Sequence, residues 1–365
     1  MSVVDSFYSE VERGLQGLNV GIPTGMAELD KYTYGVQRKY MYLIGGDTGS
    51  GKTTYALFTY VYKPLQYALE HPEIPVDILY FSLEMSKETL CAKLLSLYIL
   101  DKYHVYISYK EIFSLDTPLS AEKLKYVKES REWLEKVMCH LTIYDKAANA
   151  NVVNTVTRMW ASNFGDFEET ETSEIFTPFD ENQYLITAVD HLRLLVGNDK
   201  KTEINNCSDA LVALRDLCKL TVVLIQQLNR NFKSMERRTS AYAYISLEDF
   251  ADASGPSQNA EIVIALYYPH REKRNTCEGY DIKKLRDSFR LIQILKQRYG
   301  TADILKGVLF KGEIGYYKEL PNPEVYELDY EQFNSPSYIW EDSSVNQSKK
   351  DINDDKGLTF NFNLK

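Results

Sequence analysis

The residues whose types and spacing could perform chemistry begin with a segment that matches G-x-x-x-x-G-K-[ST] in full. Backbone N–H groups of such a loop cradle phosphates, the lysine reaches the β- and γ-phosphate oxygens, and the hydroxyl ligates Mg²⁺. An apolar run, YMYLIG, precedes the segment and a helical one, TTYALFTYVY, follows it, as the motif requires. The residues expected to bind ATP are Gly46, Asp47, Thr48, Gly49, Ser50, Gly51, Lys52, Thr53 and Thr54.

Two carboxylates stand where they could complete a hydrolysis site. Glu84 ends the strand ILYFSLE and Asp190 ends the strand YLITAVD. Since ligands of open parallel sheets bind at the carboxyl ends of the strands, both acids are expected to point toward the phosphates. Asp190 is predicted to hold Mg²⁺ through water, together with Thr53, and Glu84 to polarise the attacking water. A third strand, TVVLIQQLNR, places Gln227 where its amide could sense the γ-phosphate.

The elements that must position these residues alternate between apolar runs and helical segments from about residue 38. This alternation predicts an α/β domain with a mainly parallel sheet, helices on both faces and antiparallel strands at its C-terminal end. Near-continuous apolar strands indicate burial on both faces. The predicted strands are 40–44, 78–83, 141–144, 184–189, 222–225, 262–267, 290–295 and 308–310, and the predicted helices are 53–69, 86–101, 119–138, 151–163 and 205–219.

Three parts of the chain stand apart from this pattern. Residues 1–20 contain a short amphipathic helix over 5–18, which is marginal alone and so is expected to dock on its own domain or a neighbouring subunit. Residues 21–330 form the main domain, with inserts at 101–140 and at 165–182, the second read as an acidic exposed loop. Residues 331–365 are expected to be a disordered acidic or polar tail with an apolar end, which is either a frayed terminus or a peptide that docks on a partner.

Composition sets outer limits on the kind of protein. The 365 residues are 44% hydrophobic with a formal net charge of −10, which suits a globular protein with a sizeable core. Five scattered cysteines without C-x-x-C spacing argue against a zinc site or a disulfide framework. No run of apolar residues is long enough to span a membrane, and the start of the chain is not a secretory signal. A cytoplasmic protein is therefore expected.

Five stretches together resemble the ATPase domain of DnaB-type hexameric replicative helicases, including phage versions. In chain order they are GIPTGMAELDKYTYGVQRKYMYLIGGDTGSGKTT, ILYFSLEMS, AVDHLRLL, VVLIQQLNR and LIQILKQRYGTA. The resemblance covers about residues 21–302 and implies a RecA-like P-loop NTPase core. SLEM, QLNR and KQR are its specific parts, since a P-loop alone indicates only an NTPase.

The family's site roles carry over residue by residue. Glu84 in SLEM resembles the catalytic glutamate, Asp190 the Walker B aspartate and Gln227 the glutamine sensor. Lys296 and Arg298 in KQR resemble finger residues that reach the ATP of a neighbour, so the resemblance implies a homo-oligomer, expected as a hexameric ring. The family's N-terminal primase-binding domain is not expected in this chain, and a bacterial host cytoplasm is expected if a phage encodes it.

The resemblance also implies a single-stranded DNA partner gripped by two loops. The first, NRNFKSMERR, follows the sensor strand and contributes the candidate DNA-binding residues Arg230, Lys233, Arg237 and Arg238. The second, 249–261, contains Gly255, and its small residues would let backbone N–H groups approach phosphate. Ala251 stands in it where the family has an arginine.

Three functions are compatible with these features. The first is an ATP-driven, ring-forming DNA helicase with 5′→3′ direction taken from the family. The second is a RecA-fold recombinase or mediator that forms filaments, which SLEM and the KQR spacing fit less well. The third is a nucleotide-binding assembly factor without turnover, which retention of Lys52, Thr53, Glu84, Asp190 and Arg298 argues against.

Overall fold

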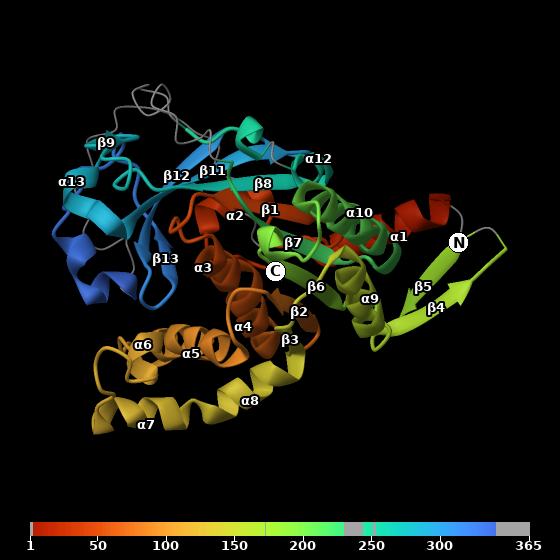
Figure 1. Ribbon diagram of the computed structural model, residues 1–365, viewed down its shortest axis with the longest axis horizontal. Coiled ribbons are helices and arrows are strands. Elements are labelled where there is room, and N and C mark those ends of the chain that lie inside the picture. The colour runs from red at the N-terminus through yellow and green to blue at the C-terminus, as the bar shows by residue number, and fades with distance from the viewer. Residues whose placement is uncertain (1–2, 172, 230–243, 251–252, 341–365) are drawn as a thin grey trace.

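The computed structural model describes residues 3–171, 173–229, 244–250 and 253–340. Its centre is a nine-stranded sheet in the order β13-β12-β11-β8-β1-β7-β6-β2-β3 (Figure 1). In chain order these strands are β1 (Met41–Gly46), β2 (Val76–Ser82), β3 (Leu141–Tyr144), β6 (Tyr184–Asp190), β7 (Thr221–Gln227), β8 (Ile262–Tyr267), β11 (Phe289–Gln297), β12 (Ile304–Lys311) and β13 (Tyr316–Glu319).

The direction of the strands divides the sheet into two parts. Strands β8, β1, β7, β6, β2 and β3 pair in parallel, whereas β8, β11, β12 and β13 pair antiparallel. The predicted fold class is confirmed, including the antiparallel C-terminal end. All eight predicted strands are present, and the antiparallel part gains β13.

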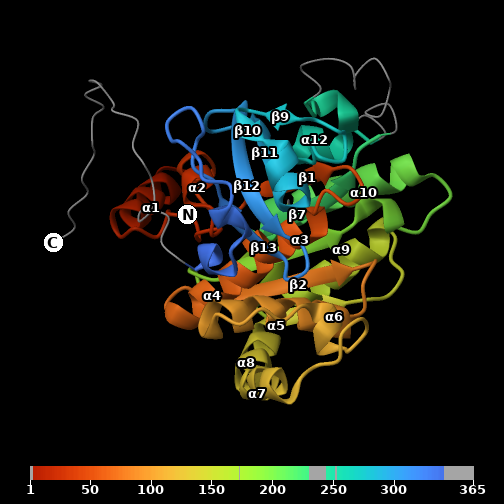
Figure 2. The ribbon, with the colours of Figure 1, turned by 90° about the vertical axis from the view of Figure 1, so that its left-hand side faces the viewer.

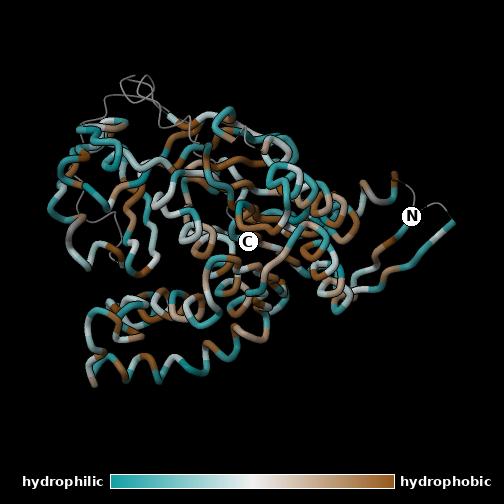
Figure 3. The backbone as a smooth tube through the Cα atoms, in the orientation of Figure 1, coloured by the Kyte–Doolittle hydropathy of each residue, from teal (hydrophilic) through white to brown (hydrophobic). Residues whose placement is uncertain are grey.

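Helices cover both faces of the sheet. Side chains on opposite faces of a central strand therefore pack into two separate hydrophobic cores. Tyr42 and Ile44 pack into one buried cluster, and Met41 and Leu43 into the other. The residues with high hydropathy lie along these strands and the helices against them (Figure 3). The helices are α1 (Val3–Leu15), α2 (Ala27–Thr33), α3 (Lys52–Leu57), α4 (Lys63–Glu70), α5 (Lys87–Tyr103), α6 (Tyr109–Ile112), α7 (Ala121–Glu129), α8 (Arg131–His140), α9 (Ala150–Ala161), α10 (Lys200–Cys218), α12 (Gly255–Asn259) and α13 (Ile282–Leu285).

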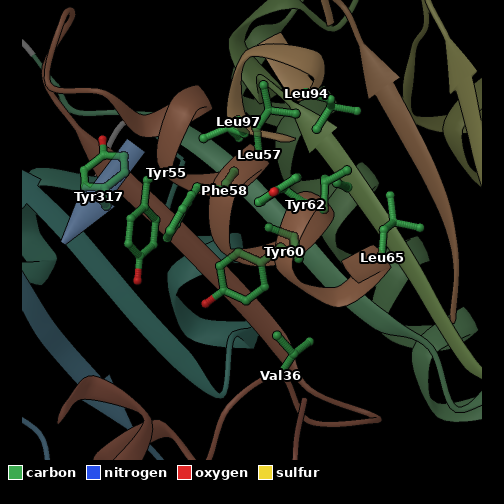
Figure 4. Packing of buried hydrophobic residues seen from close by; sticks show 14 of the residues in the cluster. Val36, Tyr55, Leu57, Phe58, Tyr60, Tyr62, Leu65, Leu94, Leu97 and Tyr317 are labelled. Carbon is green, nitrogen blue, oxygen red and sulfur yellow. The ribbon is translucent and has the colours of Figure 1, made fainter. Parts of the chain in front are cut away.

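The helix that follows the P-loop contains a π-helical turn, η1 (Phe58–Tyr62), between α3 and α4. The single helix predicted over 53–69 is thus continuous but not uniform. Phe58, Tyr60 and Tyr62 are each 1% exposed and face the core with Tyr55 and Tyr317 (Figure 4). These tyrosines fill the core and do not form a surface on which a ligand could stack, because they are buried.

Three predictions about the parts of the chain outside the central sheet are wrong. The helix predicted over 119–138 is two helices, α7 and α8, which meet at Ser130 and lie with α5 and α6 on one side of the sheet (Figures 1 and 2). The loop predicted at 165–182 contains an antiparallel hairpin of β4 (Gly165–Glu169) and β5 (Glu174–Pro178), because Phe167 and Phe176 pair across it.

The third error is the boundary at residue 330. Packing continues to Trp340, since Phe333, Tyr338 and Ile339 are at most 5% exposed. The remainder of the predicted tail, 341–365, lies outside the described residues. The predicted N-terminal helix is present as α1, with Val3, Phe7 and Leu15 at least 60% exposed. None of the helices in the described ranges is long and apolar enough to cross a membrane.

Candidate nucleotide-hydrolysis site

The P-loop joins the end of β1 to the start of α3, and its turn depends on glycine. Gly49 and Gly51 have φ angles of 76° and 99°, in the left-handed region that other residues rarely adopt. A Cβ at Gly46 would lie 2.4 Å from the Ser50 Oγ and 2.8 Å from the Leu266 carbonyl oxygen. The loop therefore has the conformation and space for backbone N–H groups to surround a phosphate at the N-terminus of α3.

Lys52 points back into this loop. Its Nζ donates to the carbonyl oxygen of Asp47 at 2.9 Å, and the residue is only 9% exposed. Burial lowers the pKa of Lys52 to about 8, although the Asp47 and Asp190 carboxylates oppose that change. An anionic phosphate placed here would favour the charged amine, as the predicted role requires.

Asp190 lies at the end of β6, beside the first turn of α3. Its Oδ1 accepts a hydrogen bond from the Thr53 hydroxyl at 2.9 Å, and its Oδ2 accepts one from the Tyr80 hydroxyl at 2.7 Å. Burial raises the pKa of Asp190 to about 6, and the nearby Glu84 carboxylate adds to the rise. The hydrogen bonds from Tyr80 and Thr53 oppose it.

These oxygens suit magnesium. Mg²⁺ takes one or two protein oxygens, substrate phosphate oxygens and several waters, rather than a cage made wholly of protein side chains. Among the described residues there is no group of three or more His, Cys, Asp or Glu side chains that could hold a metal ion. The adjacent oxygens of Thr53 and Asp190 fit the first requirement.

Glu84 follows β2, and its carboxylate lies close enough to Asp190 to affect the pKa of that acid. Its side chain is 56% exposed, and its Oε2 is 3.9 Å from the His191 Nε2. The Leu83 N–H donates to the Asp190 carbonyl oxygen at 2.9 Å, which ties the two strand ends together. Glu84 thus combines a fixed backbone with access to solvent, as a residue that polarises water needs.

Two adjacent glutamines end β7 and point to different parts of the molecule. The Gln227 Nε2 donates to the Thr48 hydroxyl at 2.5 Å, so this side chain contacts the P-loop. The Gln226 Nε2 donates to the carbonyl oxygens of Phe250 at 3.3 Å and Ala253 at 3.2 Å. One strand end therefore contacts both the P-loop and the 249–261 segment.

Two arginines that the sequence did not single out support the P-loop from β11 and the loop after β8. The Arg290 Nε donates to the Ser50 carbonyl oxygen at 2.8 Å and its Nη2 to that of Gly49 at 3.3 Å. Its guanidinium stacks 3.6 Å from the Tyr268 ring centroid. Arg271 donates to the Thr48 carbonyl oxygen. The sequence offers one signal for Arg290, because a charged residue stands there at the start of a strand that is otherwise mostly apolar.

Lys296 and Arg298 lie at the other edge of the sheet. Strand β11 runs antiparallel to β8, so its start pairs with Tyr267 near the P-loop and Gln297 pairs with Ile262 at the far edge. With a rise of about 3.3 Å per residue, the two edges are roughly 15–20 Å apart. The structure therefore does not bring these two cations to the P-loop of their own subunit.

The predicted DNA-binding residues are only partly visible. Arg230, Lys233, Arg237, Arg238 and the substituted Ala251 lie outside the described residues. Gly255 is the first residue of α12, and its N–H donates to the Asn205 Oδ1 at 3.0 Å. That N–H is already used within the chain, so a phosphate at this position would have to replace the asparagine.

Comparison with known proteins places this geometry in a family. Residues 21–319 match the family described as DnaB-like helicase C terminal domain. The replicative DNA helicase DnaB of Helicobacter pylori is 25% identical over 257 residues, which cover 68% of this chain and 44% of that protein. The protein of the same name from Buchnera aphidicola is 24% identical over 308 residues, covering 83% of this chain and 56% of that protein. The chain thus spans about half the length of these relatives.

Solved structures agree in fold. One of them, described as an ATPase domain, superposes with a TM-score of 0.65 at 20% identity, covering 88% of this chain and 100% of that one. A DnaB-like replicative helicase, described with its interactions with primase, gives a TM-score of 0.63 at 21% identity and covers 88% of this chain and 67% of its own. Since the family match extends over most of the sequence, the chain belongs to the DnaB-like helicase C-terminal domain family.

Proposed function

We propose that this protein is the ATP-driven motor of a DnaB-type replicative helicase, which moves 5′→3′ along single-stranded DNA as a homo-oligomeric ring, expected to be a hexamer. The 5′→3′ direction is that of the family. The observation that carries the proposal is the position of Lys296 and Arg298 at the sheet edge opposite the P-loop. Two finger cations that cannot reach the nucleotide of their own subunit are suited to one bound by another copy.

Within one subunit, the described residues provide ATP binding and most of the hydrolysis chemistry. The P-loop N–H groups and Lys52 would hold the phosphates, and Thr53 and Asp190 would hold Mg²⁺, with Asp190 acting through water. The metal neutralises charge on the phosphate oxygens when it is bound. Glu84 accepts a proton from the attacking water, which its exposed carboxylate can approach.

The neighbouring copy completes the site. Phosphoryl transfer develops negative charge on the transferred group, and an arginine supplied from another subunit stabilises that charge, worth about 10³–10⁵ in rate in comparable systems. Lys296 and Arg298 both donate to the Gln258 carbonyl oxygen, at 2.8 and 2.9 Å, and so lie on one surface. Assembly and hydrolysis are thereby coupled.

The nucleotide state reaches DNA through the end of β7. Gln227 contacts Thr48 of the P-loop, and Gln226 beside it holds the backbone of Phe250 and Ala253. A change at the γ-phosphate can therefore reach the segment before Gly255. The cationic loop with Arg230, Lys233, Arg237 and Arg238 follows β7 in the chain and is proposed to bind the DNA. Cationic side chains at such a loop grip the DNA backbone through its phosphates.

The remaining parts of the chain have proposed roles in assembly. The apolar residues exposed on α1 suit docking on an adjacent subunit, with residues 1–20 as the linker. Residues 21–340 form the motor domain, and residues 341–365 are proposed to bind a replication partner. The site of action is the cytoplasm, of a bacterial host cell if a phage encodes the protein.

The test is DNA-stimulated ATPase and unwinding of a forked duplex by the full chain, with an accessory loader, for wild type and Glu84→Ala. Wild type should unwind forks with a free 5′ single-stranded arm, and the variant should still assemble and bind ATP but not unwind. Absence of unwinding by assembled wild type would defeat the proposal. Electron micrographs with an ATP analogue and an oligonucleotide then distinguish rings from recombinase-type filaments.

A further inference from the structure

A buried carboxylate, Glu261, joins the proposed Arg298 finger to the interior of its own subunit. Glu261 immediately precedes β8 and is only 3% exposed. Its carbonyl oxygen accepts the Arg298 N–H at 3.0 Å, so the two residues are fixed side by side along the backbone.

The two oxygens of this carboxylate have different partners. Oε2 accepts from the Met41 N–H and from the Arg215 Nη1, both at 2.7 Å. Oε1 is 3.5 Å from the Arg298 Nη1. One oxygen is thus committed to the interior of the domain, and the other faces the finger.

A second contact holds the same guanidinium. The Arg298 Nη2 donates to the Gln258 carbonyl oxygen in α12 at 2.9 Å. The side chain of Arg298 nevertheless remains 44% exposed. Arg298 is therefore anchored at its inner side while part of it stays accessible to another molecule.

Anchoring of this kind matters for a residue that must act across an interface. A free arginine side chain samples many rotamers, and ordering it at the moment of reaction costs entropy that lowers the rate. A guanidinium held beforehand in one orientation avoids that cost. Met41, whose N–H donates to the Glu261 carboxylate, begins β1, and the P-loop starts at the opposite end of that strand.

We infer that Glu261 is a positioning residue, which holds Arg298 in the orientation that reaches the nucleotide bound by the neighbouring copy. The inference rests on the proposed function, in which Arg298 acts on that nucleotide. Arg215 balances the charge of the buried carboxylate, so Glu261 can hold the finger without becoming an isolated buried anion.

The first measurement compares Glu261→Gln with wild type. Glutamine keeps an oxygen for the Met41 N–H but removes the charge that faces Arg298. We expect kcat for ATP to fall roughly tenfold while KM changes less than about twofold, because a trans finger acts in the transition state and not in ATP binding. Glu129→Gln is the control, since it makes the same change at an exposed carboxylate of α7, whose ion pair with Lys125 is a surface contact, and its kcat should stay within about twofold of wild type.

Mixed assemblies then separate positioning from general damage. Subunits with Lys52→Ala cannot turn over ATP, yet they still present a finger surface to the next, wild-type subunit. Wild type is mixed in equal amounts with K52A, with K52A/E261Q or with K52A/R298A, and assembly is checked by size. Each double variant should inhibit the wild-type subunits more strongly than K52A alone.

The outcomes distinguish this inference from the proposed function. If K52A/R298A inhibits more than K52A but K52A/E261Q does not, Glu261 has no positioning role and the trans finger stands. If K52A/R298A inhibits no more than K52A, the trans finger fails and the inference with it. A higher kcat for E261Q would overturn the inference, because Glu261 would then restrain the finger. Should E261Q not assemble, Glu261→Asp, which keeps the buried charge but withdraws it from Arg298, makes the same comparison.

Discussion

The hydroxyl of Thr53 donates a hydrogen bond of 2.9 Å to the carboxylate of Asp190, and so joins the P-loop helix to the end of β6. The two residues are far apart in the chain, and the parallel pairing of β1, β7 and β6 brings them together. This contact places two oxygens of the kind that Mg²⁺ prefers beside the position of the phosphates.

Replacing Asp190 by asparagine should remove the metal-side charge and keep the shape. We expect kcat for ATP to fall by about 10²-fold or more, and the remaining activity to need a higher Mg²⁺ concentration. Steady-state ATPase measured across a range of Mg²⁺ concentrations checks this. Asp166→Asn on the exposed face of β4 is the control and should behave as wild type. An unchanged Mg²⁺ dependence of Asp190→Asn would exclude the metal role.

The sequence could predict this pair because both residues belong to local patterns, a P-loop and an apolar strand that ends in an acid. It could not predict Tyr80, whose hydroxyl holds the other oxygen of Asp190 at 2.7 Å. Tyr80 is one apolar-type residue within a buried strand, and only the pairing of β2 with β6 turns its hydroxyl toward the acid. The spacing of residues within one strand does not reveal which side chains of a neighbouring strand they will contact.

The same reasoning explains the errors in the irregular segments. The acidic composition of 165–182 suggested a loop, but Phe167 and Phe176 sit at paired positions and close a hairpin. Its register becomes evident only when the two strands are aligned. Likewise Phe333 and Tyr338 lie in a stretch without apolar periodicity. They are buried because they pack into one of the hydrophobic clusters of the sheet domain.

Lys52 gives a pH-dependent prediction for nucleotide binding. Burial lowers its pKa to about 8 in the free protein, and bound phosphate favours the charged amine, so the pKa rises on binding. Affinity for an ATP analogue should therefore be constant below about pH 8 with respect to this group. Above it, affinity should fall by up to about tenfold per pH unit, because binding must then take up a proton.

Titration of a fluorescent ATP analogue between pH 7 and pH 9.5 measures this effect, with Lys52→Met as the comparison. The variant should bind more weakly and lack the fall above pH 8.

The stability of the free protein should change with pH in the opposite direction to the affinity. Between the folded pKa of about 8 and the unfolded value of 10.5, the unfolded chain binds more protons, so Lys52 makes unfolding harder as pH rises through that window. If the affinity for the ATP analogue depends on pH in the same way in wild type and in Lys52→Met, then Lys52 is not the group that titrates.

Arg290 should control the shape of the P-loop. Its guanidinium donates to the carbonyl oxygens of Ser50 and Gly49, and it is 3% exposed. Lysine cannot reproduce this planar two-pronged contact or the stacking on Tyr268, so Arg290→Lys should raise KM for ATP roughly tenfold. Arg286→Lys, on the exposed surface nearby, should leave KM unchanged. Equal KM values for the two variants would show that Arg290 only fills space.

The C-terminal boundary can be tested by truncation. A chain that ends at Trp340 keeps the buried Phe333, Tyr338 and Ile339, whereas one that ends at Tyr330 loses all three. Removing large buried side chains costs about 2–5 kcal/mol each, and part of that cost is recovered when the remaining surface relaxes. We therefore expect the shorter chain to melt at least roughly 5 °C below the chain that ends at Trp340. Thermal unfolding by circular dichroism makes the comparison, with a third chain that ends at Trp340 and carries Phe333→Ala as an intermediate case. Identical melting temperatures for all three would restore the boundary at residue 330.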